Sequence, residues 1–202
     1  MVKKKIDLRI KNLSVSLPKI TIHPNLPTLC FSMAVIGKSG CGKSNCLCNL
    51  ILKYKKNFKD NLYIFQKSPC DTIKKNLIDN QKINGIRFKN IIDKKGNNIL
   101  EEIIKSQKEY IKNGEQPPYV LILFDDYYDN ETLKRHSVLT DLYSLSRHYN
   151  ISIINVVHSY TLLNSNLKRM AKYFIIFKMT NEDERKKMAY ELSNCVDLTE
   201  KD

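Results

Sequence analysis

A glycine-rich segment that ends in a lysine and a hydroxyl residue has the composition of a phosphate-binding loop. Residues 37–44 read Gly-Lys-Ser-Gly-Cys-Gly-Lys-Ser and fit the pattern G-x-x-x-x-G-K-[ST] at every fixed position. Glycines let backbone N–H groups turn toward phosphate oxygens, and the helix that starts after such a loop adds partial positive charge. In this pattern Lys43 reaches the β- and γ-phosphates, and the Ser44 hydroxyl ligates Mg²⁺. The segment therefore predicts that a nucleoside triphosphate binds with Mg²⁺ to nine consecutive residues: Gly37, Lys38, Ser39, Gly40, Cys41, Gly42, Lys43, Ser44 and Asn45.

Two adjacent acids follow an apolar segment at 120–124. In proteins with a phosphate loop, the first acid at such a strand end holds Mg²⁺, and a second acid can orient and activate a water molecule. These roles fall to Asp125 and Asp126. Neighbouring side chains on a strand point to opposite faces, so the strand must bend at its end for both acids to serve one site. The alternative is an acid pair that caps a helix or a turn.

Three residues further along the chain are candidates for completing the site. His158 ends the apolar segment 151–157, where a polar residue can sense the γ-phosphate if this strand lies beside the loop strand. Arg147 precedes the same segment, and Arg169 lies before the last apolar segment. Either arginine could reach the nucleotide of a neighbouring subunit and stabilise charge in the transition state. The alternative for each of the three is an ordinary surface side chain.

The elements that must position these residues alternate between strands and helices. Apolar runs indicate strands, and apolar stripes at helical spacing indicate helices. Lys43 and Asp125 are 82 residues apart, with at least one strand between them in sequence. This spacing favours a P-loop NTPase of the ASCE/RecA-like type, with a mainly parallel sheet and helices on both faces. The predicted strands cover 31–36, 62–65, 119–124, 151–157 and 173–177, and the predicted helices cover 43–54, 100–113, 131–148 and 161–170.

We divide the chain into three parts. Residues 1–30 alternate as strands do and predict an N-terminal β segment, and 31–180 form the core. Residues 181–202 are an acidic tail that begins as a helix, since Thr180 and Asn181 each stand three residues before an acid. Residues 67–96 are polar and basic and lack a clear period.

The charge of the chain is strongly basic and uneven. It has 202 residues, 34 Lys and Arg against 21 Asp and Glu, and a formal net charge of +13. Residues 182–202 hold seven acids and four bases, so the remainder carries about +16. Such a field favours polyanions, meaning nucleic acid or phosphorylated ligands. No apolar stretch reaches the roughly 20 residues of a membrane span, no secretion signal follows the N-terminus, and the six cysteines have no paired zinc spacing, which indicates reduced intracellular thiols.

Taken together, these residues resemble the DNA-packaging ATPases of large DNA viruses and virophages, the poxvirus-type branch of the FtsK–HerA superfamily. Four segments carry the resemblance: the strand, loop and helix of 33–49, the pair Asp125-Asp126, the run Arg147-His148-Tyr149-Asn150-Ile151-Ser152-Ile153-Ile154, and the terminal strand 172–177 after Arg169. The resemblance covers about residues 20–180. Many relatives carry Gln where this chain has His158, and some carry Thr where it has Ser44.

This resemblance implies a homo-oligomeric ring that hydrolyses ATP with Mg²⁺ and drives double-stranded DNA into a preformed capsid. The implied partners are the DNA, further copies of the chain, and the viral capsid or a portal-like vertex. The implied location is the host cytoplasm, in the viral factory, with the virion as a second location. Contacts with DNA are expected at phosphates, and Lys67-Ser68, Lys74-Lys75 or the segment 82–95 could supply them.

Two other functions are compatible with a phosphate loop. A small-molecule P-loop kinase usually has a lid with several arginines, whereas most positive charge here is lysine. A non-catalytic assembly protein could bind nucleotide only to set its shape. Phosphate transfer to a nucleoside or sugar without DNA would indicate the kinase, and ATP binding without turnover would indicate the assembly protein.

Overall fold

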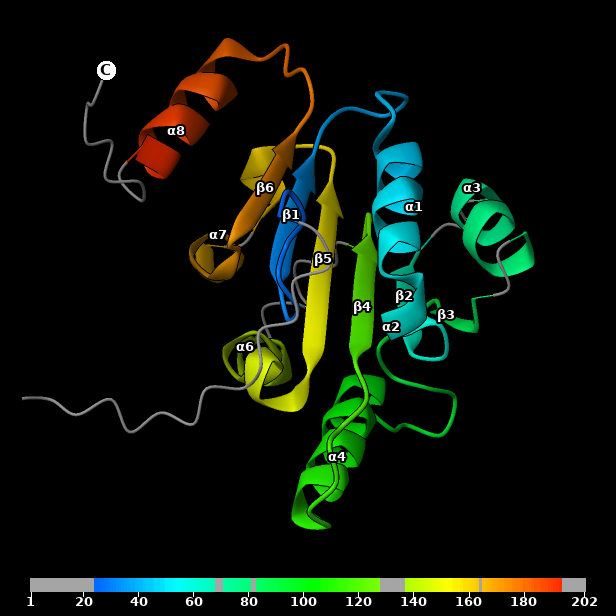
Figure 1. Cartoon of the computed structure of the whole chain (residues 1–202). Coiled ribbons are helices and arrows are strands. Elements are labelled where there is room, and N and C mark those ends of the chain that lie inside the picture. The colour runs from blue at the N-terminus through cyan, green and yellow to red at the C-terminus, as the bar shows by residue number, and fades with distance from the viewer. Residues whose placement is uncertain (1–23, 68–70, 81–82, 128–136, 164, 194–202) are drawn as a thin grey trace, which may run out of the picture.

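A parallel β-sheet lies at the centre of the chain (Figure 1). The computed structural model describes residues 24–67, 71–80, 83–127, 137–163 and 165–193, and these residues form six strands in the order β3-β2-β4-β5-β1-β6. All neighbouring strands run parallel. The predicted α/β fold class is therefore confirmed. The strands are β1 (Ser32–Ile36), β2 (Leu62–Gln66), β3 (Gly85–Phe88), β4 (Val120–Asp125), β5 (Ile151–Val157) and β6 (Tyr173–Ile176).

Helices connect the strands, as parallel pairing requires. The helix that follows the phosphate loop is α1 (Lys43–Lys53), and β4 is preceded by α4 (Ile99–Lys112). Asn98 caps α4, because its side-chain oxygen accepts hydrogen bonds from the N–H groups of Leu100 and Glu101. The remaining helices and helical turns are α2 (Lys55–Phe58), α3 (Asp71–Ile73) with a π-helical continuation η1 (Lys74–Asp79), α6 (Ser137–Leu145), η2 (Ser146–Tyr149), η3 (Tyr160–Leu162), α7 (Ser165–Met170) and α8 (Glu182–Ser193).

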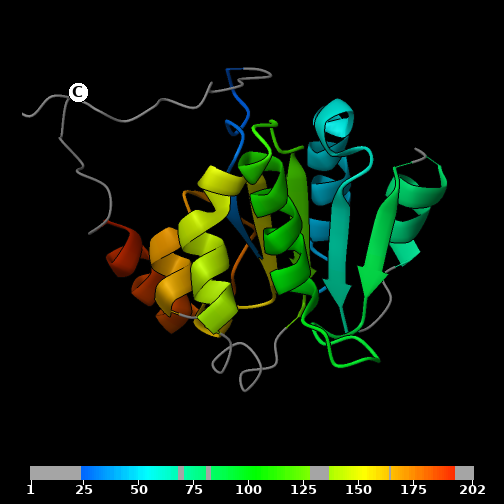
Figure 2. The ribbon, with the colours of Figure 1, turned by 90° about the horizontal axis from the view of Figure 1, so that it is seen from below.

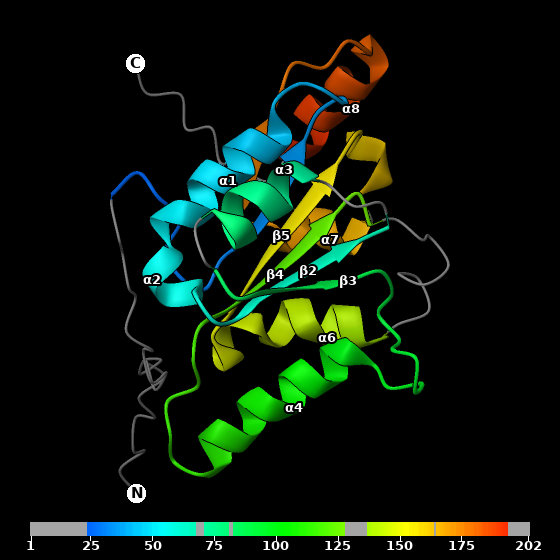
Figure 3. The ribbon, with the colours of Figure 1, turned by 90° about the vertical axis from the view of Figure 1, so that its right-hand side faces the viewer.

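Each face of the sheet is covered by a different set of helices. Figure 3 shows α1, α2 and α3 on one face and α4 and α6 on the other, and Figure 2 shows α7 beside α6 and α4. Alternate strand residues accordingly divide between two cores: Met33 and Val35 pack toward α1, while Ala34 and Ile36 pack toward α4 and α6. Strands β1, β4 and β5 are buried along their whole length, which matches their continuous apolar sequences.

The strand order places β5 between β1 and β4. This confirms the predicted division of P-loop proteins in which another strand separates the loop strand from the acidic strand. Because every strand is parallel, the ends of β1, β2, β4 and β5 meet at one edge of the sheet. The loop after β1, the acids at the end of β4 and the residue after β5 therefore share that edge.

The predicted segments outside the core have different outcomes. Of the N-terminal β segment, residues 1–23 lie outside the described residues, and 24–30 form turns and bends. The start of the tail is helical as expected: the Asn181 side-chain oxygen accepts a hydrogen bond from the Glu184 N–H at the first turn of α8. Among the described residues, no helix combines the length and apolar composition that a membrane crossing requires.

Candidate nucleotide site

The phosphate loop forms a tight turn between β1 and α1. The Gly37 N–H donates to the Val157 carbonyl at 3.0 Å, which ties the start of the loop to the end of β5. Gly40 and Gly42 have φ angles of +75° and +100°, a backbone conformation that side chains with a Cβ rarely adopt. Gly42 is also the N-cap of α1 and leaves its first turn without a side-chain cap or an acid. The free N–H groups of that turn can therefore face an anion.

Close packing explains the first glycine of the loop. A Cβ added to Gly37 would lie 2.6 Å from the Phe177 Cβ and 2.7 Å from the Cys41 Sγ. The Phe177 N–H donates to the Ile36 carbonyl at 2.8 Å, so the end of the β6 segment supports the loop. Cys41 thus fills space inside the turn, while Lys38, Ser39 and Gly40 are exposed around its outside. Ser44 is half-buried in the first turn of α1, and Asn45 beside it is exposed.

Lys43 is the buried centre of the site. Its ammonium donates to the carbonyls of Gly37 at 2.6 Å and Lys38 at 2.9 Å, and it lies 3.2 Å from His158 Nδ1. An ammonium has no lone pair, so Nδ1 must accept, and the proton of the neutral imidazole is on Nε2. His158 Nε2 in turn lies 2.9 Å from Asp126 Oδ2. A continuous chain of contacts therefore links Lys43, His158 and Asp126.

The two aspartates face one site because the strand bends after Asp125. Asp126 has a φ of +46°, uncommon for a residue with a side chain, and this turns it away from the alternation of β4. Burial raises the pKa of Asp125, while the Gln66 amide lowers it and the Asp126 charge raises it further. Burial also raises the pKa of Asp126, with His158 and Lys43 acting in the opposite direction. One Asp126 oxygen, Oδ1, is buried and makes no hydrogen bond among the described residues.

Gln66 is a site residue that sequence reasoning missed. It ends β2, is 5% exposed, and pairs across the sheet with Asp125 in register. Its Nε2 donates to Asp125 Oδ2 at 2.5 Å, while its Oε1 is buried without a partner among the described residues. A single amide at a strand end has no pattern to detect. The available signal was its position after an apolar segment, where polar residues of parallel sheets gather around ligands.

The donor set suits Mg²⁺ held together with a nucleotide. Among the described residues, no group of three His, Cys, Asp or Glu side chains forms a metal cage. Mg²⁺ is commonly held by one or two carboxylates, substrate phosphates and water, so a cage is not required. The carboxylate of Asp125, the Ser44 hydroxyl on α1 and two buried acceptors without partners, Gln66 Oε1 and Asp126 Oδ1, fit that arrangement.

The two candidate arginines lie away from this group. Arg147 is exposed in η2, directly before β5, and Arg169 is exposed in α7, before β6. Both positions are at the starts of parallel strands, whereas the phosphate loop follows the end of β1. The structure therefore brings Lys43, Asp125, Asp126 and His158 together, but neither arginine joins them within one chain.

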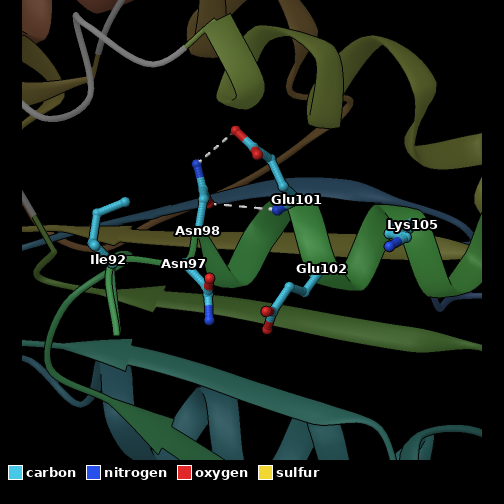
Figure 4. Close-up of a pocket in the computed structure, with 7 residues that line it drawn as sticks. Ile92, Asn97, Asn98, Glu101, Glu102 and Lys105 are labelled. Carbon is cyan, nitrogen blue, oxygen red and sulfur yellow. Dashed lines mark hydrogen bonds between the residues drawn. The ribbon is translucent and has the colours of Figure 1, made fainter. Parts of the chain in front are cut away.

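A separate polar pocket lies at the start of α4 (Figure 4). Its volume is about 490 Å³, and none of the residues predicted for the nucleotide site lines it. Glu101 and Glu102 belong to the first turn of α4, where acids offset the helix dipole. The lining is thus explained by the helix start: Ile92, Gly96, Asn97, Asn98, Glu101, Glu102 and Lys105.

Solved structures with the same fold include secretion and packaging ATPases. The cytoplasmic domain of EssC matches with a TM-score of 0.55 and 15% identity over 78% of this chain and 35% of that chain. This chain therefore spans about a third of that relative. B204, the DNA-packaging ATPase from Sulfolobus turreted icosahedral virus, matches with a TM-score of 0.56 and 16% identity over 81% of this chain and 82% of that chain. The B204 of Sulfolobus turreted icosahedral virus 2, solved in complex with ATP-gammaS, has a TM-score of 0.56 and 14% identity over the same shares.

Sequence comparison extends beyond the shared fold. No curated protein sequence matches the chain. A protein family described as Poxvirus A32 protein matches residues 22–195, a range that includes the phosphate loop, both aspartates and α8. Because this match covers most of the sequence, the chain belongs to the poxvirus A32 protein family, in agreement with the resemblance to packaging ATPases of the poxvirus type.

Proposed function

We propose that this chain is an ATP-driven motor that moves double-stranded viral DNA into a preformed capsid. Membership of the A32 family and a fold shared with B204, a DNA-packaging ATPase, support a genome-packaging ATPase. The observation that carries the proposal is the contact chain from Lys43 through His158 to Asp126. It joins the phosphate loop to the acidic strand end, which is the arrangement that hydrolysis of a γ-phosphate requires.

Each residue at this edge has a distinct task in the proposed reaction. Lys43 binds the β- and γ-phosphates, exchanging its loop carbonyl partners for phosphate oxygens. Ser44 and Asp125 would hold Mg²⁺, which neutralises phosphate charge when bound. Asp126 accepts a hydrogen bond from the attacking water through Oδ1 and orients it toward the γ-phosphorus. His158 contacts both Lys43 and Asp126, so a movement of Lys43 toward phosphate changes the hydrogen bonding of the base.

A neighbouring copy of the chain must supply the arginine. Arg147 and Arg169 are both at the opposite edge of the sheet, so we propose that a ring of subunits brings one of them to the next nucleotide. Mixing a Lys43→Ala chain with an Arg147→Ala chain tests this, because each chain then carries one intact half of a shared site. Restored activity in the mixture supports Arg147 as the trans residue. The same mixture with Arg169→Ala tests its rival.

The DNA contact is proposed at a turn between β3 and α4. The Asp93 side chain accepts hydrogen bonds from the N–H groups of Lys95 at 2.7 Å and Asn97 at 2.8 Å, and this orders the turn before any ligand binds. Lys94 and Lys95 are exposed on it. The turn follows the end of β3 and so lies at the same edge as the phosphate loop. Its lysines could contact DNA phosphates without reading sequence, which suits a motor.

The central experiment measures the ATPase rate with and without long duplex DNA. We expect DNA to stimulate the wild-type protein, Lys43→Ala to abolish nucleotide binding, and Asp126→Asn to bind nucleotide without hydrolysing it. Lys94→Ala/Lys95→Ala should weaken DNA binding and lower the salt dependence by about two charges. Lys55→Ala/Lys56→Ala is a matched control, since it removes an adjacent pair on α2, before β2.

The alternatives give different results in the same assay. Phosphate transfer to a nucleoside or sugar without DNA would indicate a small-molecule kinase. Nucleotide binding without turnover, even with DNA and high protein concentration, would indicate an assembly protein. The capsid or a portal-like vertex as docking partner, and the host cytoplasm and virion as locations, belong to the same proposal and require imaging of infected cells and purified particles.

A further inference from the structure

Gln66 is a buried polar side chain that the reaction described above does not use. Burying an amide without partners costs free energy, so an apolar side chain would be the default at the end of the apolar strand β2. Gln66 instead donates Nε2–H to Asp125 Oδ2 at 2.5 Å. An ionised carboxylate can only accept hydrogen bonds, so the amide nitrogen must face Asp125, and this sets the direction of the amide oxygen.

The direction of that oxygen points to a ligand. Gln66 Oε1 is buried and has no partner among the described residues, and Asp126 Oδ1 nearby along β4 is in the same condition. Both atoms are acceptors, so the group that satisfies them must supply donors. Water molecules bound to a metal ion are strong donors, and Mg²⁺ keeps several of them when it binds. The register of β2 and β4 places Gln66 directly opposite Asp125, the proposed metal ligand.

We propose that Gln66 is a positioning residue for the metal ion that accompanies the nucleotide. Its Nε2–H holds one oxygen of Asp125 in a fixed orientation, and its Oε1 accepts a hydrogen bond from a water molecule bound to the metal. Residues that orient a metal ligand in this way typically change metal affinity by about 10-fold to 100-fold when they are replaced. This inference rests on the proposed function, because it takes Asp125 as the metal ligand.

The test measures Mn²⁺ binding to the full-length protein by electron paramagnetic resonance, with a non-hydrolysable ATP analogue at saturation. Gln66→Met keeps the length of the side chain but removes both hydrogen bonds. We expect it to weaken Mn²⁺ binding by about 10-fold to 100-fold. Analogue binding in EDTA should remain at the wild-type level, because Gln66 is proposed to act through the metal alone. Gln66→Asn, which withdraws the amide by one methylene, should weaken Mn²⁺ binding in the same direction if the first variant folds poorly.

Gln107 provides a matched control. It is also a buried glutamine, 2% exposed, whose Nε2 donates to a carbonyl, that of Pro118 at 2.9 Å, and whose Oε1 has no partner among the described residues. It lies on α4, and its partner precedes β4, at the edge away from the phosphate loop. Gln107→Met should therefore lower thermal stability as Gln66→Met does, yet leave Mn²⁺ binding unchanged.

The outcomes separate the inference from the function on which it rests. Weaker Mn²⁺ binding in Gln66→Met than in Gln107→Met, with unchanged analogue binding in EDTA, supports the positioning role. Equal Mn²⁺ binding in both variants overturns it and leaves Gln66 a structural residue. If Asp125→Asn also binds Mn²⁺ as the wild-type protein does, Asp125 is not the metal ligand, and the proposed function loses its metal site as well.

Discussion

Two carboxylates hold the C-terminal helix α8 against the body of the protein. No residue of α8 is buried, although Met188 packs on the core from its surface. Glu184 accepts hydrogen bonds from the Tyr160 N–H and the Ser159 hydroxyl, each at 2.5 Å. Glu191 accepts from the Tyr160 hydroxyl at 2.8 Å and from Lys168 Nζ at 3.0 Å. A helix of 12 residues is marginal in water by itself, so we expect its docking to depend on these contacts.

Replacing Glu184 by Ala should release α8. The change removes two hydrogen bonds to a charged acceptor, each worth about 1.5–3 kcal/mol when shielded from water. The site is partly exposed, so we take the lower end and expect a total loss of about 2–3 kcal/mol, at least a 30-fold fall in the ratio of docked to undocked helix. The global unfolding temperature should change little, because α8 contributes no buried residue.

Hydrogen exchange of the α8 amides measures this directly. Glu182→Ala is the control, because it removes an acid from the same first turn, where Glu182 forms only an exposed ion pair with Lys186 at 2.9 Å. Both variants therefore lose a similar interaction with the helix dipole and gain similar helix propensity. Equal exchange rates in the two variants would refute the docking role of Glu184. The contact matters for function because Ser159 directly follows His158.

Three further predictions follow from the same geometry. Hydrogen bonds from the Tyr160 hydroxyl and Lys168 lower the pKa of Glu191, so its contribution to docking is complete above the ordinary Glu pKa of 4.5 and is lost as pH falls through the lower folded value; α8 exchange that rises instead near pH 6 would contradict this. Burial raises the pKa of Asp125, so its ionised form is unfavourable in the fold, and Asp125→Asn should raise the unfolding temperature by about 2–4 °C per kcal/mol relieved while abolishing metal binding; a lower temperature would show that the charge is well compensated. Gly37→Ala would place a Cβ less than 3 Å from two neighbouring side-chain atoms, and overpacking of this kind costs about 1–3 kcal/mol, so calorimetry should show weaker nucleotide binding, and wild-type affinity would mean that the loop has room to adjust.

The sequence predicts the central strands well because they are buried on both faces. The apolar runs that become β1, β4 and β5 leave little choice of structure, and the glycines of the phosphate loop have a known geometric purpose. Residues 67–96 could not be assigned for the opposite reason. They contain α3, η1 and β3, and β3 is an edge strand whose Ile86 is 51% exposed. An edge strand buries less of its surface, so its sequence lacks the apolar run that identifies a central strand.

The predicted site was recoverable only where a residue belonged to a pattern. Lys43, Asp125 and Asp126 stand in recognisable motifs, and His158 was chosen by its position after an apolar segment. Gln66 required the strand order and the register, since it meets Asp125 only because β2 pairs with β4 in parallel. Long-range pairing of this kind has no local signature in a single sequence.

Strand order also explains which side chains touch. Reading across the sheet, β2 supplies Gln66, β4 supplies the two aspartates, β5 leads to His158, and β1 leads to the loop with Lys43. The observed contacts follow the same sequence, from Gln66 to Asp125 and from Asp126 through His158 to Lys43. Neighbouring parallel strands are about 4.8 Å apart, so the loop strand and the acidic strand, with β5 between them, are about 10 Å apart. A side chain at the end of β5 is therefore needed to connect the lysine to the acid, and this gives the position of His158 a physical basis as the point where a change at the phosphate loop reaches the base.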